Sequence, residues 1–325
     1  MLVFVSQRLV QSVFLMLVMS MILFMGIYQI GNPIDILISP EADQQEIARA
    51  IQSFGLDQPL WKQYLVYLGN LLQGDLGVSF AHNVPALELI FSRMPATLEL
   101  AVAALLMAIV FGVPLGLLAG YHPDSILGRA IMAGSVLGFS LPTFWVGIIL
   151  IMIFSVMLGW LPASGRGPTV TVLGMEWSFL TWDGLRSLFL PALNLALFKI
   201  SLVIRLTRAG VREVLPMEYV RYARSRGLSS QRILWAHVLP NTLIPVVTVL
   251  GLEFGTLIAF SVVTETIFAW PGMGKLIIDS INLLDRPVIV AYLMMIVLIF
   301  IVINLFVDVV YSLLDPRVRV SEASE

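Results

Sequence analysis

The sequence has no cysteine, few charged residues and only three histidines, and each shortage removes a class of protein. Without cysteine the chain forms no disulfide, thiolate metal site or cysteine nucleophile. Charged residues make up 12% of it, against roughly 25% in an ordinary soluble domain. In their place the chain is 58% hydrophobic with a mean hydropathy of +0.93. This composition indicates an integral membrane protein, and a net charge of -2 gives no reason to expect a nucleic-acid partner.

Sites for catalysis or metal binding are also missing from the pattern. The three histidines have no carboxylate or histidine partner at metal-ligand spacing; they are His82, His122 and His237. Gly272 to Lys275 (GMGK) is similar to the end of a phosphate-binding loop, but Ala269 and Leu276 stand where that motif needs glycine and Ser/Thr. No hydrolase triad or pair of carboxylates stands out. We therefore expect no enzyme, no metal site and no cofactor in this chain.

Long apolar runs set the fold class. A helix needs about 20 residues to cross a bilayer, and the runs of that order are Leu9 to Tyr28, Ala96 to Gly120, Ile131 to Leu158, Leu188 to Leu206, Thr242 to Val263 and Val288 to Leu314. The first run is longer than the apolar part of a cleaved signal peptide, and no small-x-small cleavage pattern precedes Gly31. We expect an all-α integral membrane protein with about six transmembrane helices.

The arginines that flank these runs predict the orientation, because cytoplasmic loops carry an excess of Lys and Arg. With the N-terminus inside, the cytoplasmic side holds Arg8, Arg129, Arg317, Arg319 and the seven arginines of residues 205–240. The other side holds Arg49, Lys62, Arg93, Arg166, Arg186, Lys275 and Arg286, spread over much more chain. Both termini are therefore predicted to be cytoplasmic.

The first external segment is too long and polar for a simple connector. Pro40 to Phe54 has the pattern of a capped amphipathic helix, and Leu60 to Leu72 is an aromatic-rich amphipathic run suited to the membrane interface. The stretch Trp160 to Trp182 is rich in Pro and Gly and is predicted to be a loop. The expected divisions are residues 1–30 for the N-terminus and first span, 31–93 for an external helical segment, and 94–325 for a core of five spans with a cytoplasmic loop at 207–240.

Glycines recur at four-residue spacing inside two spans. Gly112, Gly116 and Gly120 fall on one face of the second span, and Gly251 and Gly255 repeat the spacing in the fifth. Such faces let another helix backbone approach closely. Helix packing is favoured over a role in ligand binding.

Four ionisable residues lie inside or near the ends of spans: Lys199, Glu253, Asp308 and Glu99. Charges in lipid are costly, so each should face a cavity, a partner charge or another subunit. Structural pairing and contact with a substrate are equally compatible with the sequence. Asp308 lies about two turns from the cytoplasmic end of its span and can pair with an arginine there.

A polar, basic stretch from Arg205 to Pro240 interrupts the apolar sequence and holds seven of the chain's 19 Lys and Arg residues. Its pattern indicates helix, turn, helix. Pro216 suits the first turn of a helix and Gly227 the left-handed position just past its end. Ser229 or Ser230 can cap a second short helix, which Pro240 is expected to stop. We interpret the stretch as a shaped docking element.

The same stretch resembles the cytoplasmic "EAA" loop of permease subunits in binding-protein-dependent ABC importers. Ala223, Gly227 and Leu239-Pro240 match that pattern, whereas Arg221 and Tyr222 stand where its Glu and Ala would be. This departure fits the dipeptide, oligopeptide and nickel permease branch, in which the loop resembles (D/E)Y(I/V)RxARx(K/R)GL. Residues 218–228 read EYVRYARSRGL.

Other segments similar to this branch run along the whole chain. They are GLDQP at 55–59, GDLG at 74–77, PATLEL at 95–100, TETIFAWPG at 264–272 and DPR at 315–317. The chain is thus identified as resembling a type I ABC importer permease. The resemblance implies a multi-pass protein of a bacterial or archaeal cytoplasmic membrane.

The resemblance also implies partners and a mechanism. The partners would be a second homologous permease, two cytoplasmic ATPases that hold ATP and Mg, a periplasmic or lipid-anchored binding protein, and membrane lipid. By position, Leu228 to Trp235 would form a coupling helix in a cleft of the ATPase, with Gly227 setting its turn. The expected coupling residues are Arg221, Ala223, Arg224, Arg226, Gly227, Leu228, Ser229, Arg232, Leu239 and Pro240. Their arginines equally fit ordinary positive-inside placement.

Import of di- or oligopeptides is the function that this resemblance implies, with nickel chelates, glutathione or another small solute as alternatives within the same fold. A secondary transporter is the alternative from another class, but it would commonly show repeated halves, and no convincing repeat is present. Residues that line the substrate path are expected from the second, third and fifth spans.

Overall fold

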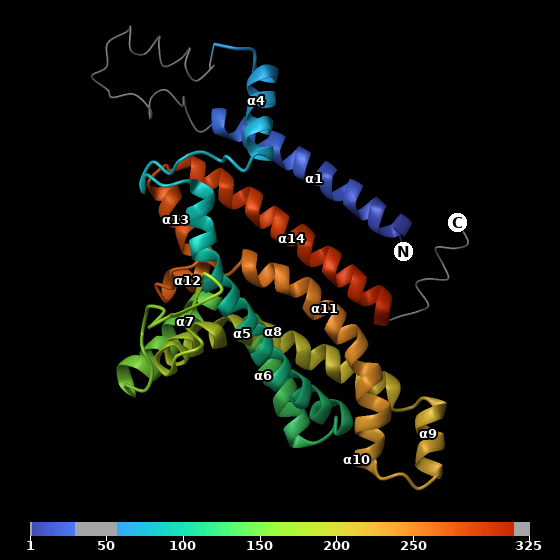
Figure 1. The fold of residues 1–325 in the computed structure, drawn as a ribbon. Coiled ribbons are helices and arrows are strands. Elements are labelled where there is room, and N and C mark those ends of the chain that lie inside the picture. The colour runs from blue at the N-terminus through green and yellow to red at the C-terminus, as the bar shows by residue number, and fades with distance from the viewer. Residues whose placement is uncertain (1, 30–56, 315–325) are drawn as a thin grey trace. The chain divides into compact units, whose positions relative to one another are not determined.

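The computed structural model describes residues 2–29 and 57–314, and the side chains of residues 8–26 and 57–307. These residues form helices and one two-stranded sheet (Figure 1). The chain divides into two compact units, one of Met1–Ser92 with Asp279–Ile301 and one of Arg93–Ile278 with Val302–Glu325. In chain order the elements are α1 (Leu2–Gln29), α4 (Leu60–Leu72), α5 (Ala86–Tyr121), α6 (Ile126–Ser140), α7 (Thr143–Leu150), η1 (Ile151–Met157), β1 (Val170–Val172), β2 (Met175–Trp177), α8 (Trp182–Val214), α9 (Glu218–Ser225), α10 (Ser230–Ile233), η2 (Leu234–Val238), α11 (Leu239–Ala259), α12 (Val262–Ile267), α13 (Met273–Asn282) and α14 (Arg286–Leu314).

The all-α fold with about six spans is confirmed. Five helices of the described residues are long and apolar enough to cross a membrane, and a bent pair of helices makes a sixth if it counts as one span. That pair is the predicted span Ile131 to Leu158, which is not one straight helix: α6 and the α7–η1 helix meet at 106°. Leu141, which precedes Pro142, is extended with φ -81° and ψ 134°. The proline disfavours helical backbone at the residue before it, and α6 ends there.

The first unit contains α1 and α4. Tyr64 of α4 lies against Phe24 of α1 with ring centroids 5.4 Å apart, and its hydroxyl lies 2.9 Å from the Ser20 hydroxyl. The helix predicted at Leu60 to Leu72 is confirmed with the same bounds, while its place in the membrane interface stays a prediction. The helix predicted at Pro40 to Phe54 lies outside the described residues.

The glycines of the second span do pack against another helix. A Cβ built on Gly112 would lie 2.7 Å from Val203, on Gly116 2.6 Å from Thr207, and on Gly120 2.7 Å from Val211. The three contacted residues belong to α8, so the glycine face seats α5 against α8. A Cβ on Gly251 of α11 would meet Val307 of α14 at 2.6 Å. The predicted packing role is therefore confirmed for these four glycines.

The stretch Trp160 to Trp182 is not only a loop. β1 and β2 pair antiparallel within it, with Val172 opposite Met175. The two turn residues, Leu173 and Gly174, have φ of 54° and 77°. Positive φ at both central residues is the geometry of a tight hairpin turn that matches strand twist. The expected loop thus contains a short hairpin.

Candidate functional site

The polar stretch at residues 205–240 contains a short separate helix, α9, between the ends of α8 and α10 (Figure 1). Gly227 ends it with φ 79° and donates its N–H to the Arg224 carbonyl at 3.0 Å, while the Leu228 N–H reaches the Ala223 carbonyl at 3.3 Å. These two bonds form a Schellman motif, which satisfies the last carbonyls of a helix. The predicted helix-ending role of Gly227 has this physical basis.

One face of α9 is buried in its own chain. Val220 is 0% and Ala223 5% exposed, and both belong to an apolar cluster with Val214 of α8 and with Ile233 and Val238 beyond the turn. Leu228 also packs against this cluster, so the hydrophobic contact that usually accompanies a Schellman motif is present. These buried contacts hold α9 in a fixed position. A solvated connector would have no such contacts.

The opposite face of α9 is exposed, basic and aromatic. Its exposed residues are Glu218, Tyr219, Arg221, Tyr222, Arg224, Ser225 and Arg226, and Arg232 of α10 is also exposed. The Arg226 guanidinium lies 5.1 Å from the Tyr222 ring centroid and donates to its hydroxyl at 2.8 Å from Nε. Arg221 forms an exposed ion pair with Glu218 at 3.0 Å, of a kind that contributes little stability. The face thus presents cations to an outside partner.

Two sequence expectations about this stretch need correction. The isolated short helix precedes Gly227, whereas residues 228–235 run into a longer helix that begins at Ser230 with Ser229 as its N-cap. Pro240 does not stop that helix, which continues through η2 and α11 to Ala259. In a regular α-helix the Pro240 ring would clash with a carbonyl one turn earlier. The wider π-helical turns of η2, directly before it, make room for the ring.

Exposed aromatic residues of the loop were missed by the sequence reasoning. Tyr222 is 59% and Trp235 64% exposed. Aromatic and Arg side chains are the residue types enriched at the centres of protein interfaces. The sequence did carry a signal for Tyr222, because this tyrosine stands where the resembling pattern has alanine.

The polar candidates inside the spans form an ion pair. Lys199 of α8 pairs with Glu253 of α11, and Thr256 lies 3.0 Å from the Lys199 amine and donates to Glu253 Oε2 at 2.8 Å. The structure contains the predicted pairing, and contact with a substrate stays a prediction. Asp308 belongs to α14, but its side chain lies outside the described part of the chain.

Replacing Lys199 by methionine should destabilise the folded chain, because Glu253 loses its partner charge among apolar helices. The cost should fall below the about 3–5 kcal/mol of a fully buried pair, since the Glu253 side chain is 27% exposed. The double variant Lys199→Met/Glu253→Met should regain wild-type stability, measured by thermal unfolding in detergent. Substrate uptake by the double variant provides the control: lost uptake at full stability would contradict a purely structural pair.

Glu99 anchors the hairpin segment to α5. Its carboxylate accepts Arg166 Nε at 2.9 Å and the Ser178 hydroxyl at 2.9 Å, and it also accepts the Ser178 main-chain N–H. The side chains of Glu99 and Arg166 are 0% and 8% exposed. This residue is therefore engaged with a partner charge, as the sequence required.

A second buried carboxyl, Glu265, joins α12 to α5 and was not found from the sequence. It accepts the Thr97 and Ser261 hydroxyls, each at 2.8 Å, and the Lys275 main-chain N–H at 2.9 Å. A Cβ on Gly274 would lie 3.0 Å from this carboxylate, and one on Gly272 would also collide with it. The Gly272 to Lys275 segment thus wraps a carboxylate of its own chain.

The environment of Glu265 shifts the pKa of its carboxyl group. Burial raises the pKa of the Glu265 carboxyl above its ordinary value, although hydrogen bonds from Thr97, Lys275 and Ser261 act in the opposite direction. Two further bonds close the same contact: Trp270 Nε1 donates to the Ala96 carbonyl and Met273 N to the Thr97 hydroxyl, both at 2.8 Å. The segments PATLEL and TETIFAWPG, far apart in the sequence, are thus bound to each other.

Within the described residues, no group of three or more His, Asp or Glu side chains is arranged to hold a metal ion. The candidate site is the exposed basic and aromatic surface of residues 205–240.

Comparison with known proteins places these features in a family. The family model described as binding-protein-dependent transport system inner membrane component matches residues 112–320, and the model for the N-terminal part of such membrane components matches residues 1–101. The chain is similar to solved structures of the MetNI methionine ABC transporter in inward facing conformations. One has a TM-score of 0.54 at 18% identity and covers 70% of this chain and 96% of that chain, which is a likeness of fold.

Curated relatives match over most of their length. The di/tripeptide transport system permease protein DppB of Pseudomonas aeruginosa is 42% identical over 304 residues, 89% of this chain and 90% of that protein. The oligopeptide transport system permease protein AppB of Bacillus subtilis is 39% identical over 290 residues, with the same coverage. The glutathione transport system permease protein GsiC of Escherichia coli O6:H1 is 38% identical over 320 residues, 98% of this chain and 99% of that protein. This chain therefore belongs to the inner membrane components of binding-protein-dependent transport systems, the permeases of ABC importers, and is a multi-pass inner membrane protein.

Proposed function

We propose that this chain is the permease subunit that carries di- or oligopeptides across the membrane, driven by ATP hydrolysis on two cytoplasmic ATPases. The observation that carries the coupling part is the geometry of α9, whose apolar face is fixed to its own chain while its basic, aromatic face is exposed. A fixed element transmits a rigid-body movement of a partner into the helices that flank it. ATP and Mg belong to the ATPases in this proposal.

The proposed coupling surface includes the residues expected from the sequence, now with α9 as its central helix. Arg221, Arg224, Arg226 and Arg232 face outward and would meet acidic groups of the ATPase. Ala223, Leu228 and Leu239 belong to the apolar cluster or pack against it and so support the surface from behind. Gly227 and Ser229 shape the turn, and Pro240 lies in the first turn of α11, inside the long helix.

The proposed orientation places both termini and residues 205–240 in the cytoplasm. It rests on the arginines that flank the spans. The other partners would be a second homologous permease and a periplasmic or lipid-anchored binding protein, in a bacterial or archaeal inner membrane.

The proposed substrate class rests on the relatives, whose names assign di/tripeptides, oligopeptides and glutathione to their systems. Glutathione is itself a small peptide, so these names agree on a peptide-like solute. Nickel chelates and other small solutes are the alternative. Calorimetry on the cognate binding protein, with di- and tripeptides against nickel chelates, decides between them: binding of the chelate alone would refute peptide import.

A secondary transporter is disfavoured, because the family to which the chain belongs works with a binding protein. The complete transporter, reconstituted with its second permease, ATPases and binding protein, tests this directly. Uptake into the vesicles should require ATP on the side of the membrane that carries the ATPases. Uptake driven by an ion gradient alone would refute the proposal.

Replacing Gly227 by valine should uncouple ATP hydrolysis from transport. A side chain at φ 79° strains the backbone by roughly 1–2 kcal/mol, although open space surrounds the position. The strain should shift α9 and lower substrate-stimulated ATP hydrolysis of the reconstituted transporter.

Gly174 offers a matched control, with φ 77°, open surroundings and a place in the hairpin outside the loop. Gly174→Val should cost similar strain and leave stimulated hydrolysis unchanged. Equal effects of the two variants on hydrolysis would contradict the coupling role.

A further inference from the structure

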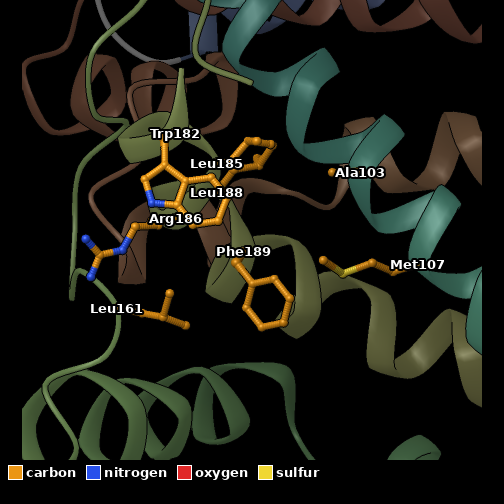
Figure 2. Close-up of a pocket in the computed structure, with 8 residues that line it drawn as sticks. All are labelled: Ala103, Met107, Leu161, Trp182, Leu185, Arg186, Leu188 and Phe189. Atoms are coloured by element: carbon orange, nitrogen blue, oxygen red, sulfur yellow. The ribbon is translucent and has the colours of Figure 1, made fainter. Parts of the chain in front are cut away.

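A pocket of about 380 Å³ opens between α5 and α8, away from the coupling surface. Its walls come from Ala103, Met107, Leu161, Trp182, Leu185, Arg186, Leu188 and Phe189 (Figure 2). Of these residues, Arg186 alone is charged. Figure 2 shows its guanidinium group turned away from Met107, which faces the ring of Phe189. The pocket thus has an apolar interior with one cation at its edge.

The pocket lies along helices that are apolar enough to cross the membrane. From Trp182 to Phe189 its wall extends over about 10 Å of α8, at 1.5 Å per residue. Trp182 is 75% exposed and Trp160, whose carbonyl accepts Arg186 at 2.7 Å, is 61% exposed. Exposed tryptophans at the end of a span mark the level of lipid head groups. The two tryptophans thus favour a position of the cation near the lipid head groups, with the apolar walls extending from it along the span.

The charge of Arg186 is not neutralised inside the protein. Its nearest carboxylate, on Asp183, is 3.8 Å away, and both side chains are exposed. Exposed pairs at such distances contribute little. A guanidinium group can therefore bind a phosphate, for which its fork of donors is well suited.

We propose that this pocket is a binding site for an anionic phospholipid, with one acyl chain between Met107 and Phe189 and the phosphate on Arg186. Charge complementarity selects the anionic head group, and the apolar walls select the chain. A peptide with an apolar side chain and a free carboxylate also combines an apolar group with an anion. The test therefore includes a dipeptide as a competitor.

The test uses the complete transporter in phosphatidylcholine vesicles that contain a trace of photoreactive lipid, with a diazirine on the acyl chain of phosphatidylglycerol or of phosphatidylcholine. Mass spectrometry should place the label on residues 103–107 and 185–189, with about fivefold more from phosphatidylglycerol. Arg186→Gln should reduce that labelling to the phosphatidylcholine level. Ala103→Phe, which fills the pocket, should reduce labelling by both lipids.

Two residues outside the pocket wall provide matched controls. Arg129 is an exposed arginine of α6 that does not line the pocket, and Val102 is an exposed neighbour of Ala103. Arg129→Gln and Val102→Phe should leave labelling unchanged. Equal labelling by both lipids that is insensitive to Arg186→Gln would overturn the proposal. Displacement of the label by saturating apolar dipeptide would also overturn it, because the occupant would then be substrate.

Discussion

Replacing Glu99 by leucine is expected to lower the free energy of unfolding by about 3–5 kcal/mol, the usual cost of breaking a buried ion pair. The change leaves the Arg166 guanidinium buried without its carboxylate and removes an acceptor from Ser178 and Phe179. Thermal unfolding of the purified permease in detergent measures the loss. Limited proteolysis should at the same time show faster cleavage near Leu173, because the hairpin segment is no longer anchored.

Glu176 provides the control for this result. It lies in β2 of the same segment, and its exposed carboxylate has only a long contact of 3.4 Å with the Thr169 hydroxyl. Glu176→Ala should therefore leave unfolding and proteolysis near wild type. The double variant Glu99→Leu/Arg166→Leu should be more stable than Glu99→Leu alone, because no buried charge remains unpaired. Equal unfolding of Glu99→Leu and Glu176→Ala would contradict the anchoring role.

Replacing Glu265 by leucine should cost about 2–6 kcal/mol, since two buried donors lose their acceptor and each such loss costs about 1–3 kcal/mol. These donors are the Lys275 N–H and the Thr97 hydroxyl, whereas the Ser261 hydroxyl keeps the Ile258 carbonyl at 3.0 Å as an acceptor. Glu265→Gln is the matched variant. Its amide oxygen can still accept from Lys275 while its NH₂ group donates to the two hydroxyls, so it should be much milder. Thermal unfolding separates the two, and equal destabilisation would contradict this hydrogen-bond account.

Glu265 should also make stability depend on pH in a defined direction. Because burial raises its pKa in the folded chain, the folded state keeps this proton at pH values where the unfolded state has lost it. The stabilisation is therefore complete below the ordinary value of 4.5 and is lost as pH rises through the higher folded pKa. The free energy of unfolding of the wild type should decline over that window relative to that of Glu265→Gln, in which this group does not titrate. Parallel pH curves for the two proteins would contradict the assignment.

The sequence predicted the spans because a run of about 20 apolar residues is a local property. It did not predict the bend at Pro142, because proline alone does not decide: Pro95, Pro114 and Pro191 lie inside continuous helices. The hairpin was missed because its turn is Leu173-Gly174 and lacks the Asn-Gly or Asp-Gly signal.

For the site residues too, local features were predictable from the sequence and long-range contacts were not. Gly227 was predictable, because a left-handed residue after a helix is a local requirement. The partners of Glu99 and Glu265 were not, because Arg166 and Thr97 lie 67 and 168 positions away along the chain. Only tertiary packing brings them together. The position of the short helix α9 also depends on the packing of Val220 and Ala223 in the apolar cluster. The pattern of arginines does not predict this packing.

The uninterrupted helix from Ser230 to Ala259 has a mechanical consequence. Its 30 residues span about 45 Å at 1.5 Å per residue, more than the thickness of the hydrocarbon core. Its first turn lies beside Gly227 at the proposed coupling surface, and Glu253 lies near its other end. Because the helix is continuous between these points, it would act as a lever in the proposed coupling. In that coupling a tilt imposed at Ser230 would displace the far end, and the π-helical turns at Leu234–Val238 are where the helix would bend.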